Sequence, residues 1–346
     1  MTGTEPISAI RFPRAEPPPF GAPIEIAPGV LWLRLPLPYA LDHVNIFLFE
    51  EEGGWAVFDT GLSDDPVYEA WEQVLNRHLG GRPITRVVVS HFHPDHVGMA
   101  GWLCERFGAP LHMPQAEYLY SRLLQSLPAT ARTEDPPFYR ALGMSAEDIQ
   151  RILNSGKRYL QRASGLPPSY HRMIAGESVA FGNRTWQILT GGGHAPEQAM
   201  LWCRDDRLFL SADQVLARIS PNVSVFEVEP DADPLGLYLA SLAAVRETVS
   251  DEVLVLPGHN LAFHGLHERI AQLIHHHEHR CSLIIAACKD TALTCRELVP
   301  ALFHRKLDPH TLSFALGETL AHLNYLVKRD RLRAATADGV VRYRTI

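Results

Sequence analysis

Three imidazoles and a carboxylate lie within six residues, in the segment HFHPDH that runs from His91 to His96. Neutral imidazole nitrogens and carboxylate oxygens are the ligands that zinc and related transition metals prefer. The segment directly follows the apolar run Arg86–Ser90, which has the composition of a buried strand. A strand end can aim several side chains at one point, so the segment predicts a divalent-metal site. A chance cluster of surface histidines is the alternative, and matching side chains later in the chain disfavour it.

Four further candidate ligands occur at the ends of other predicted strands. They are Asp59 in Asp-Thr-Gly, His194 after three glycines, Asp213 in Ser-Ala-Asp, and His259 after Pro-Gly. Glycines beside a ligand allow tight turns and a close approach of the backbone to the metal. Each of these signals is weak alone. Together they indicate one site that is assembled from several strand ends.

The elements that must position these residues fall into two runs of strands. Short β-branched or aromatic segments predict strands over 30–37, 44–50, 55–59 and 86–90, with helices over 64–79 and 97–107. Asp95 and His96 then lie at the start of the second helix. The later run predicts strands over 178–181, 185–190, 199–203, 208–212 and 253–256, with a helix over 235–249. Two runs of strands, each followed by helices, predict a sandwich of sheets flanked by helices.

Residues 115–170 separate the two runs and lack a strand pattern. They contain several prolines and a helical stretch over 146–162, so we expect a mostly helical insertion. Two interpretations of this insertion stay open. It covers the site as an apolar lid, or it is a surface elaboration without substrate contact.

The chain beyond residue 266 predicts helices over 268–289, 294–303 and 312–328, then a hairpin over 332–343. Thr294 and Glu297 have the spacing of a capping box, and Asp338-Gly339 suits the hairpin turn. This order is typical of a small winged-helix module. The histidine-rich segment 275–279 leaves a third metal or a pH-sensitive patch as alternatives. Successive helix positions point in different directions, so a solvated helix face with one or two residues packed inward is favoured.

Cysteine content, segment composition and net charge limit which class of protein the sequence can encode. The 346 residues include five cysteines without a C-x-x-C pair, which indicates reduced thiols in a cytoplasmic protein. We expect an extended, proline-containing arm over residues 1–25, no signal peptide and no membrane span. The formal charge of −7 combines an excess of eleven acidic residues before Leu261 with an excess of four basic residues from there on. This charge disfavours nucleic acid as a partner.

The ordered set of an Asp, H-x-H-x-D-H, His, Asp and His resembles the motif of the metallo-β-lactamase superfamily of hydrolases. The resemblance covers roughly residues 26–263. It implies an α+β fold, a four-layer αββα sandwich over 26–265 that carries the insertion at about 115–170. A winged-helix-like domain is then expected over 266–346.

The resemblance also implies roles for the candidate residues. His91, His93 and His194 would hold one metal, Asp95, His96 and His259 the second, and Asp213 would bridge both. Asp59 would hold a ligand in place by hydrogen bonding. A hydroxide shared by two divalent metals would be the nucleophile, with Asp95 orienting it and shuttling its proton. Zinc is the default ion, and iron or manganese also suits these ligands.

The carboxylate at position 213 resembles the thioesterase, lactonase and nuclease branches, whereas true β-lactamases usually place Cys or Ser there. The C-terminal module resembles the β-lactamase-like-2 group, which includes single-strand endoribonucleases and polyketide-releasing thioesterases. We therefore expect a small thioester or ester substrate, as in glyoxalase II-like or acyl thioesterase-like enzymes. The alternatives are a single-strand endoribonuclease or phosphodiesterase, and a non-catalytic metal-binding regulator. In the regulator, the C-terminal domain would be a nucleic-acid-binding or dimerisation module. A homodimer through the C-terminal domain is also an expectation for the enzyme.

Overall fold

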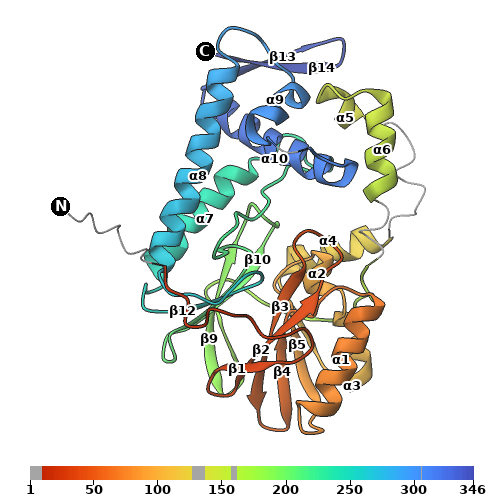
Figure 1. Cartoon of the computed structure of the whole chain (residues 1–346), viewed down its shortest axis with the longest axis vertical. Helices are drawn as coiled ribbons and strands as arrows, with labels where there is room; N and C mark the ends of the chain where they lie inside the picture. The colour runs from red at the N-terminus through yellow and green to blue at the C-terminus, as the bar shows by residue number, and fades with distance from the viewer. Residues whose placement is uncertain (1–9, 127–136, 157–161, 305) are drawn as a thin grey trace, which may run out of the picture.

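A computed structural model describes residues 10–126, 137–156, 162–304 and 306–346 (Figure 1). Two sheets lie at one end of the molecule, and the last helices and a hairpin lie at the other. The described part of the expected arm, residues 10–25, pairs with the segment after the last strand of the second sheet, where the backbones of Arg11 and His264 exchange two hydrogen bonds of 3.1 and 2.8 Å. Its last two residues already belong to the first strand.

The first sheet has seven strands in sequence order. Neighbours are antiparallel from β1 to β4 and parallel from β4 to β7. The strands are β1 (Ile24–Ala27), β2 (Val30–Pro36), β3 (His43–Glu51), β4 (Gly54–Phe58), β5 (Ile84–Val88), β6 (Leu111–Met113) and β7 (His171–Arg172). β1, β6 and β7 were not predicted, since segments of two to four residues carry too little periodicity.

The second sheet has the order β12-β11-β10-β9-β8, in which only the β11–β12 pair is parallel. Its strands match the predicted segments within one or two residues. They are β8 (Ser178–Phe181), β9 (Arg184–Gly191), β10 (Gln198–Cys203), β11 (Leu208–Ala212) and β12 (Leu254–Pro257).

Three apolar layers hold the sandwich together. Side chains such as Trp32, Phe49 and Trp186 fill the space between the two sheets. A second cluster joins the outer face of the first sheet to α1 (Asp65–Arg77) and α3 (Ala100–Phe107). A third joins the second sheet to α7 (Pro234–Thr248) and α8 (Leu266–Ala287). The predicted four-layer αββα architecture is confirmed.

The single helix expected over 97–107 is wrong in one respect. The chain forms a short α2 (Pro94–Val97) and then α3, with a break at Gly98 and Met99. A Cβ at Gly98 would lie 2.5 Å from the carbonyl oxygen of Gly61, so the two backbones are in close contact there. Met99 N donates to that carbonyl at 3.1 Å, and the helical ladder is interrupted. Gly108 ends α3 in the left-handed conformation, as its position predicts.

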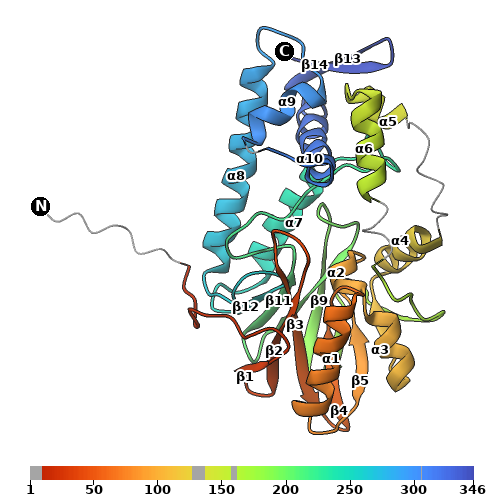
Figure 2. The same cartoon turned by 45° about the vertical axis from the view of Figure 1, so that its right-hand side comes forward.

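The insertion contains α4 (Gln115–Ser126), α5 (Pro137–Ala141) and α6 (Ala146–Gly156). The helix expected over 146–162 begins as predicted, while residues 157–161 lie outside the described part. α5 and α6 lie beside α10 and the terminal hairpin (Figure 2). Leu142, Ile149 and Ile152 join the third apolar cluster there. This part of the insertion therefore packs on the C-terminal helices.

The C-terminal elements follow the predicted order. They are α8, α9 (Cys295–Leu302), α10 (Pro309–Val327), β13 (Leu332–Ala337) and β14 (Val340–Thr345). The capping box of Thr294 and Glu297 is present. Asp338 and Gly339 both have positive φ, as a two-residue type I′ turn requires. The winged-helix assignment itself stays a prediction.

All five cysteines are buried and free. Among the described residues, no helix combines the length and hydropathy that a membrane crossing needs.

Candidate metal centre

The sequence-predicted ligands all follow the carboxyl ends of strands. Asp59 comes after β4 and the HFHPDH segment after β5, which run parallel in the first sheet. In the second sheet β9, β11 and β12 run in one direction, and His194, Asp213 and His259 follow their ends. Parallel strand ends meet at one edge of a sheet, and the stacking of the two sheets brings both edges together. This topology assembles the site from segments that are far apart in the sequence.

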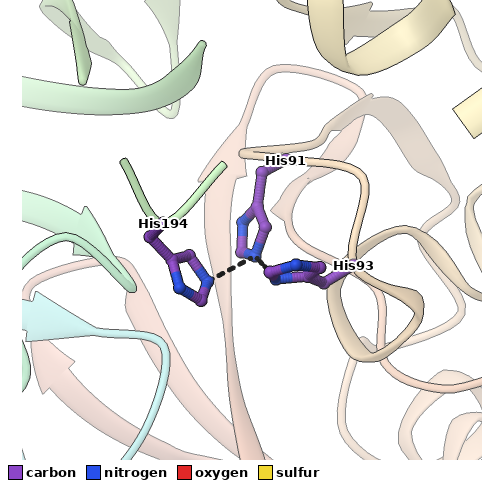
Figure 3. Close-up of side chains that lie close together, drawn as sticks. All are labelled: His91, His93 and His194. Carbon is purple, nitrogen blue, oxygen red and sulfur yellow. Dashed lines mark hydrogen bonds between the residues drawn. The ribbon is translucent and has the colours of Figure 1, made fainter. Parts of the chain in front are cut away.

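Three imidazoles form the first group (Figure 3). His91 Nε2 lies 2.9 Å from His93 Nδ1 and 3.3 Å from His194 Nε2. A tetrahedral zinc ion with Zn–N bonds of 2.0–2.1 Å separates its nitrogen ligands by about 3.3 Å. The three nitrogens are therefore spaced as the ligands of one ion.

Asp95, His96 and His259 form the second group. Asp95 Oδ2 lies 3.7 Å from His96 Nε2 and 3.4 Å from His259 Nε2. The carboxylate of Asp213 lies between the groups, because its Oδ2 is 3.4 Å from His194 Nε2 and 3.2 Å from His259 Nε2. Its Oδ1 is 3.5 Å from His96 Nε2. Asp213 is thus placed to contact ions in both groups.

Two atoms at the centre of this arrangement favour a bound cation. His96 Nε2 and Asp213 Oδ1 are buried without a hydrogen-bond partner in the described part of the chain. Unpaired buried polar atoms are rare in native proteins, and a metal ion would satisfy both. The backbone also leaves room at Gly258, where a Cβ would lie 2.3 Å from Asp213 Oδ1 and 2.8 Å from His96 Cε1. The residues present fit two divalent ions.

Asp59 fixes the HFHPDH segment through hydrogen bonds to His96 and to the preceding Ser90. Its carboxylate accepts from His96 Nδ1 at 2.8 Å, from the Ser90 amide at 2.7 Å and from Ser90 Oγ at 2.8 Å. A carboxylate that accepts from Nδ1 leaves the Nε2 lone pair of His96 facing the site. Asp59 has a φ of 59°, a left-handed conformation that turns the chain away from β4.

The outer nitrogens of three other candidate histidine ligands are held by residues that the sequence did not reveal. His91 Nδ1 pairs with Ser90 Oγ at 2.8 Å, and His194 Nδ1 donates to the Asn222 carbonyl at 2.8 Å. His259 Nδ1 donates to the His43 carbonyl at 2.7 Å. Ser90 could have been suspected from its place beside the motif. The other two partners are backbone carbonyls, for which the sequence carries no signal.

Glu117 is a further residue that the sequence did not reveal. It is fully buried in α4 and accepts from the amides of Phe92 at 3.0 Å and Glu197 at 2.5 Å. These two amides belong to the segments that carry His93 and His194. Burial raises the pKa of the Glu117 carboxyl to about 8, while the two amide donors oppose this shift. A glutamate at a buried position of an amphipathic helix was the available signal.

The pKa shifts of the clustered side chains indicate which of them are neutral and which are charged. Burial, with the charge of His194, lowers the pKa of His93 to about 3, so this ring is neutral. Burial opposes ionisation of Asp95, but His96 and His259 outweigh it and lower the pKa of Asp95 to about 2. Asp213 raises the pKa of His259 to about 10 against the effect of burial. The ionised carboxylates thus keep a proton on His259, and a divalent cation would take the place of that proton when it binds, since imidazole ligands bind metals in their neutral form.

Comparison with known proteins agrees with the geometry. Residues 39–282 match the family model described as "Metallo-beta-lactamase superfamily". Residues 281–346 match a second model, "Metallo-beta-lactamase-like, C-terminal domain".

Similar solved structures include a beta-lactamase domain protein from Burkholderia ambifaria. It has a TM-score of 0.89 and 40% identity, over 97% of this chain and 98% of that chain. A metallo-beta-lactamase family protein from Thermus thermophilus has a TM-score of 0.80 and 26% identity, over 93% and 100% of the two chains.

A curated relative is the linear primary-alkylsulfatase of Pseudomonas sp. (strain ATCC 19151), 26% identical over 225 residues. The match covers 61% of this chain but only 40% of the relative's length.

Proposed function

The chain belongs to the metallo-beta-lactamase superfamily, whose members are metal-dependent hydrolases, and on this premise we propose that it hydrolyses a carboxylic ester or thioester with two divalent metal ions. One observation carries the two-metal proposal. Seven candidate ligands from four strand ends converge, and two of their atoms are buried without any other partner among the described residues.

Each of the two groups of candidate ligands would hold one metal ion. His91, His93 and His194 would hold one ion, Asp95, His96 and His259 the other, and Asp213 would contact both. When bound, two divalent ions lower the pKa of water and stabilise negative charge that develops on a substrate oxygen. Zinc suits the ligand set, and iron or manganese would also be accepted.

Asp95 is the residue we assign to proton transfer. Its side chain is 15% exposed, whereas that of His96 is fully buried, so a carboxylate oxygen can face an incoming substrate. His96 and His259 keep this carboxyl ionised near neutral pH. Asp95 can therefore orient the attacking water and accept its proton at Oδ.

Two features support an ester or thioester with an apolar acyl group. The chain before Leu261 has an excess of eleven acidic residues, which suits a weakly charged substrate better than a polyanion. α4, which contacts the metal-binding segment through Glu117, also exposes Leu119 and Leu123 one turn apart, at 55% and 46%. Exposed leucines on an element next to the site would suit an acyl chain.

A sulfate ester is the second candidate, because the curated relative is an alkylsulfatase. It would use the same ions and the same proton acceptor, with sulfate in place of the acyl group. The phosphodiesterase and regulator alternatives have less support. The C-terminal excess of four basic residues is small, and the complete ligand set favours catalysis.

A substrate panel tests the proposal. Protein with quantified metal is assayed on acyl thioesters, carboxylic esters, lactones, alkyl sulfates and single-stranded RNA, with the His91→Ala/His93→Ala double variant as control. We expect hydrolysis of esters or thioesters that disappears in the control. Cleavage of RNA alone, or equal activity in the double variant, would contradict the proposal.

A further inference from the structure

Asn222 connects the metal centre to the C-terminal helices. Its backbone carbonyl accepts the Nδ1 proton of His194 at 2.8 Å. Its side-chain amide donates to Glu318 Oε2 at 3.2 Å. Glu318 lies in α10, more than a hundred residues from any predicted ligand except His259. One residue therefore joins a metal-facing imidazole to a helix of the C-terminal domain.

Glu318 is itself fixed by a second C-terminal helix. Its side chain is 8% exposed and pairs with Arg280 of α8. Arg280 also donates to the Leu302 carbonyl at 3.2 Å, and its guanidinium lies 4.6 Å from the Phe303 ring centroid. The carboxylate that accepts from Asn222 is thus held by contacts from α8 and from the end of α9.

The segment around Asn222 is also clamped against the backbone of α10. Val225 N donates to the Gly317 carbonyl at 3.1 Å, and Ser224 Oγ donates to Asn222 Oδ1 at 2.5 Å. A Cβ at Gly317 would lie 2.9 Å from Ser224 Cβ, so the segment packs on α10 as closely as a glycine allows. Both ends of the Asn222 side-chain amide are therefore anchored.

We propose that Glu318 and Arg280 are positioning residues for His194, and that they act through Asn222. The inference rests on the proposed two-metal function. The Asn222 carbonyl holds the proton on His194 Nδ1, which leaves the Nε2 lone pair for the metal. The direction of that carbonyl depends on an Asn222 side chain that Glu318 and Ser224 hold in place.

We call the chain of contacts from Arg280 and Glu318 through Asn222 to His194 the relay. It reaches the ligands of only one of the two ions. The outer nitrogens of His91, His96 and His259 bond to Ser90, Asp59 and the His43 carbonyl, all within the sandwich. His194 alone among these four depends on α8 and α10. The C-terminal domain should consequently tune the ion held by His91, His93 and His194 and leave the other ion unaffected.

The test is Co²⁺ binding by the full chain, followed by chelator competition and by the visible absorption of each ion. We expect Glu318→Ala to weaken one of the two ions about tenfold, as loss of an outer-shell partner does, with a changed absorption spectrum for that ion. The second ion should keep its affinity. Glu318→Gln should restore most of the loss, since its carbonyl oxygen can still accept from Asn222.

Glu297→Ala is the matched control. Glu297 pairs with Arg342 and closes the capping box of α9, so its loss destabilises the same domain without touching Asn222. We expect this variant to bind both ions as the wild type does. Ser224→Ala removes the other anchor of Asn222 by deleting one hydroxyl, and should give a smaller loss at the same ion.

The outcomes separate the two proposals. Wild-type binding of both ions by Glu318→Ala and Ser224→Ala would overturn the relay and leave the proposed function standing. An equal loss of both ions in Glu318→Ala and in Glu297→Ala would likewise overturn it. Failure of the wild-type chain to bind Co²⁺ would overturn the proposed function and the relay with it.

Discussion

Gly258 has no side chain, and this leaves the space that the candidate ligands Asp213 and His96 occupy. A Cβ at this position would lie 2.3 Å from Asp213 Oδ1 and 2.8 Å from His96 Cε1. We expect Gly258→Ala to displace both ligands and weaken metal binding at least about tenfold, on the scale of lost ligand orientation. Metal content after dialysis, measured by elemental analysis, checks this.

Gly192→Ala is the control for that prediction. Its Cβ would meet Leu237 at 3.3 Å and no candidate ligand within that distance, and neither glycine has positive φ. We expect this variant to retain its metal. Equal metal content in the two variants would show that space at Gly258 is irrelevant to the site.

Variants of Asp95 test its assigned role in proton transfer. Asp95→Asn keeps the shape of the side chain but cannot accept a proton, so kcat should fall about 10²–10⁴-fold. The Asp95→Ala variant should abolish turnover, because a ligand is lost as well. Steady-state hydrolysis on protein with measured metal content tests both variants. Near wild-type turnover in either of them would remove Asp95 from its assigned role.

At the residue scale, the sequence predicted the side chains that converge and missed what holds them. Histidine and aspartate residues at predicted strand ends can be recognised directly in the sequence. The structure brings all seven candidate ligands together. The partners of His194 and His259 are the carbonyls of Asn222 and His43. Any residue supplies a carbonyl, so only the three-dimensional path of the chain reveals these contacts.

At the scale of elements, α4 supports the segments that carry the candidate ligands His93 and His194 through Glu117. Glu117→Ala would leave the buried amides of Phe92 and Glu197 without their acceptor. Each unpaired buried group costs about 1–3 kcal/mol, so we expect the loss of the acceptor for two amides to lower the free energy of unfolding by about 2–6 kcal/mol. Chemical denaturation measures this, with the exposed Glu69→Ala as control. A change equal to that of the control would contradict the assigned role.

Elements with strong local signals were predictable from sequence. The capping box at Thr294 fixed the start of α9, and Asp338-Gly339 fixed the hairpin turn. The break between α2 and α3 was not predictable, because it depends on the backbone of Gly61 approaching Gly98 from another segment. Local propensity cannot report a contact between distant parts of the chain.

At the scale of the whole molecule, a pair of buried histidines joins the C-terminal helices. His277 Nδ1 of α8 lies 3.2 Å from His322 Nε2 of α10, and both side chains are fully buried. Burial, followed by neighbouring positive groups, lowers the pKa of His277 to about 2 and that of His322 to about 3. The charged groups facing the pair include Arg280, with His276 beside it on α8.

This pair should make the stability of the protein depend on pH. Unfolded histidines take up protons near pH 6.5, whereas the folded pair stays neutral, so the unfolded state binds more protons below about pH 6.5. Stability is therefore full above about pH 6.5 and falls as the pH drops toward about 3. Each ring contributes at most about 1.4 kcal/mol per pH unit.

His322→Gln should reduce this slope between about pH 6 and 4.5, and His279→Gln, at an exposed position of α8, should not. Denaturation midpoints at several pH values measure the two slopes. Identical slopes for both variants would show that His322 is protonated in the folded protein.

The overall sandwich was predictable because each sheet arises from a run of strands with its own periodicity. The packing of α5 and α6 on the C-terminal helices was not, since Leu142 and Ile149 find their partners only after the chain has folded. The lid over the site and the surface elaboration both stay open as interpretations of the insertion.

The central claim is that His91, His93, His194, Asp95, His96, His259 and Asp213 hold two ions that support hydrolysis. The direct test is a titration of metal-free protein with Zn²⁺, in which bound ion and thioester hydrolysis are followed in the same sample. We predict that two ions bind per chain and that hydrolysis rises with occupancy. Hydrolysis at full rate in the metal-free protein, or fewer than two ions bound per folded chain, would contradict the claim.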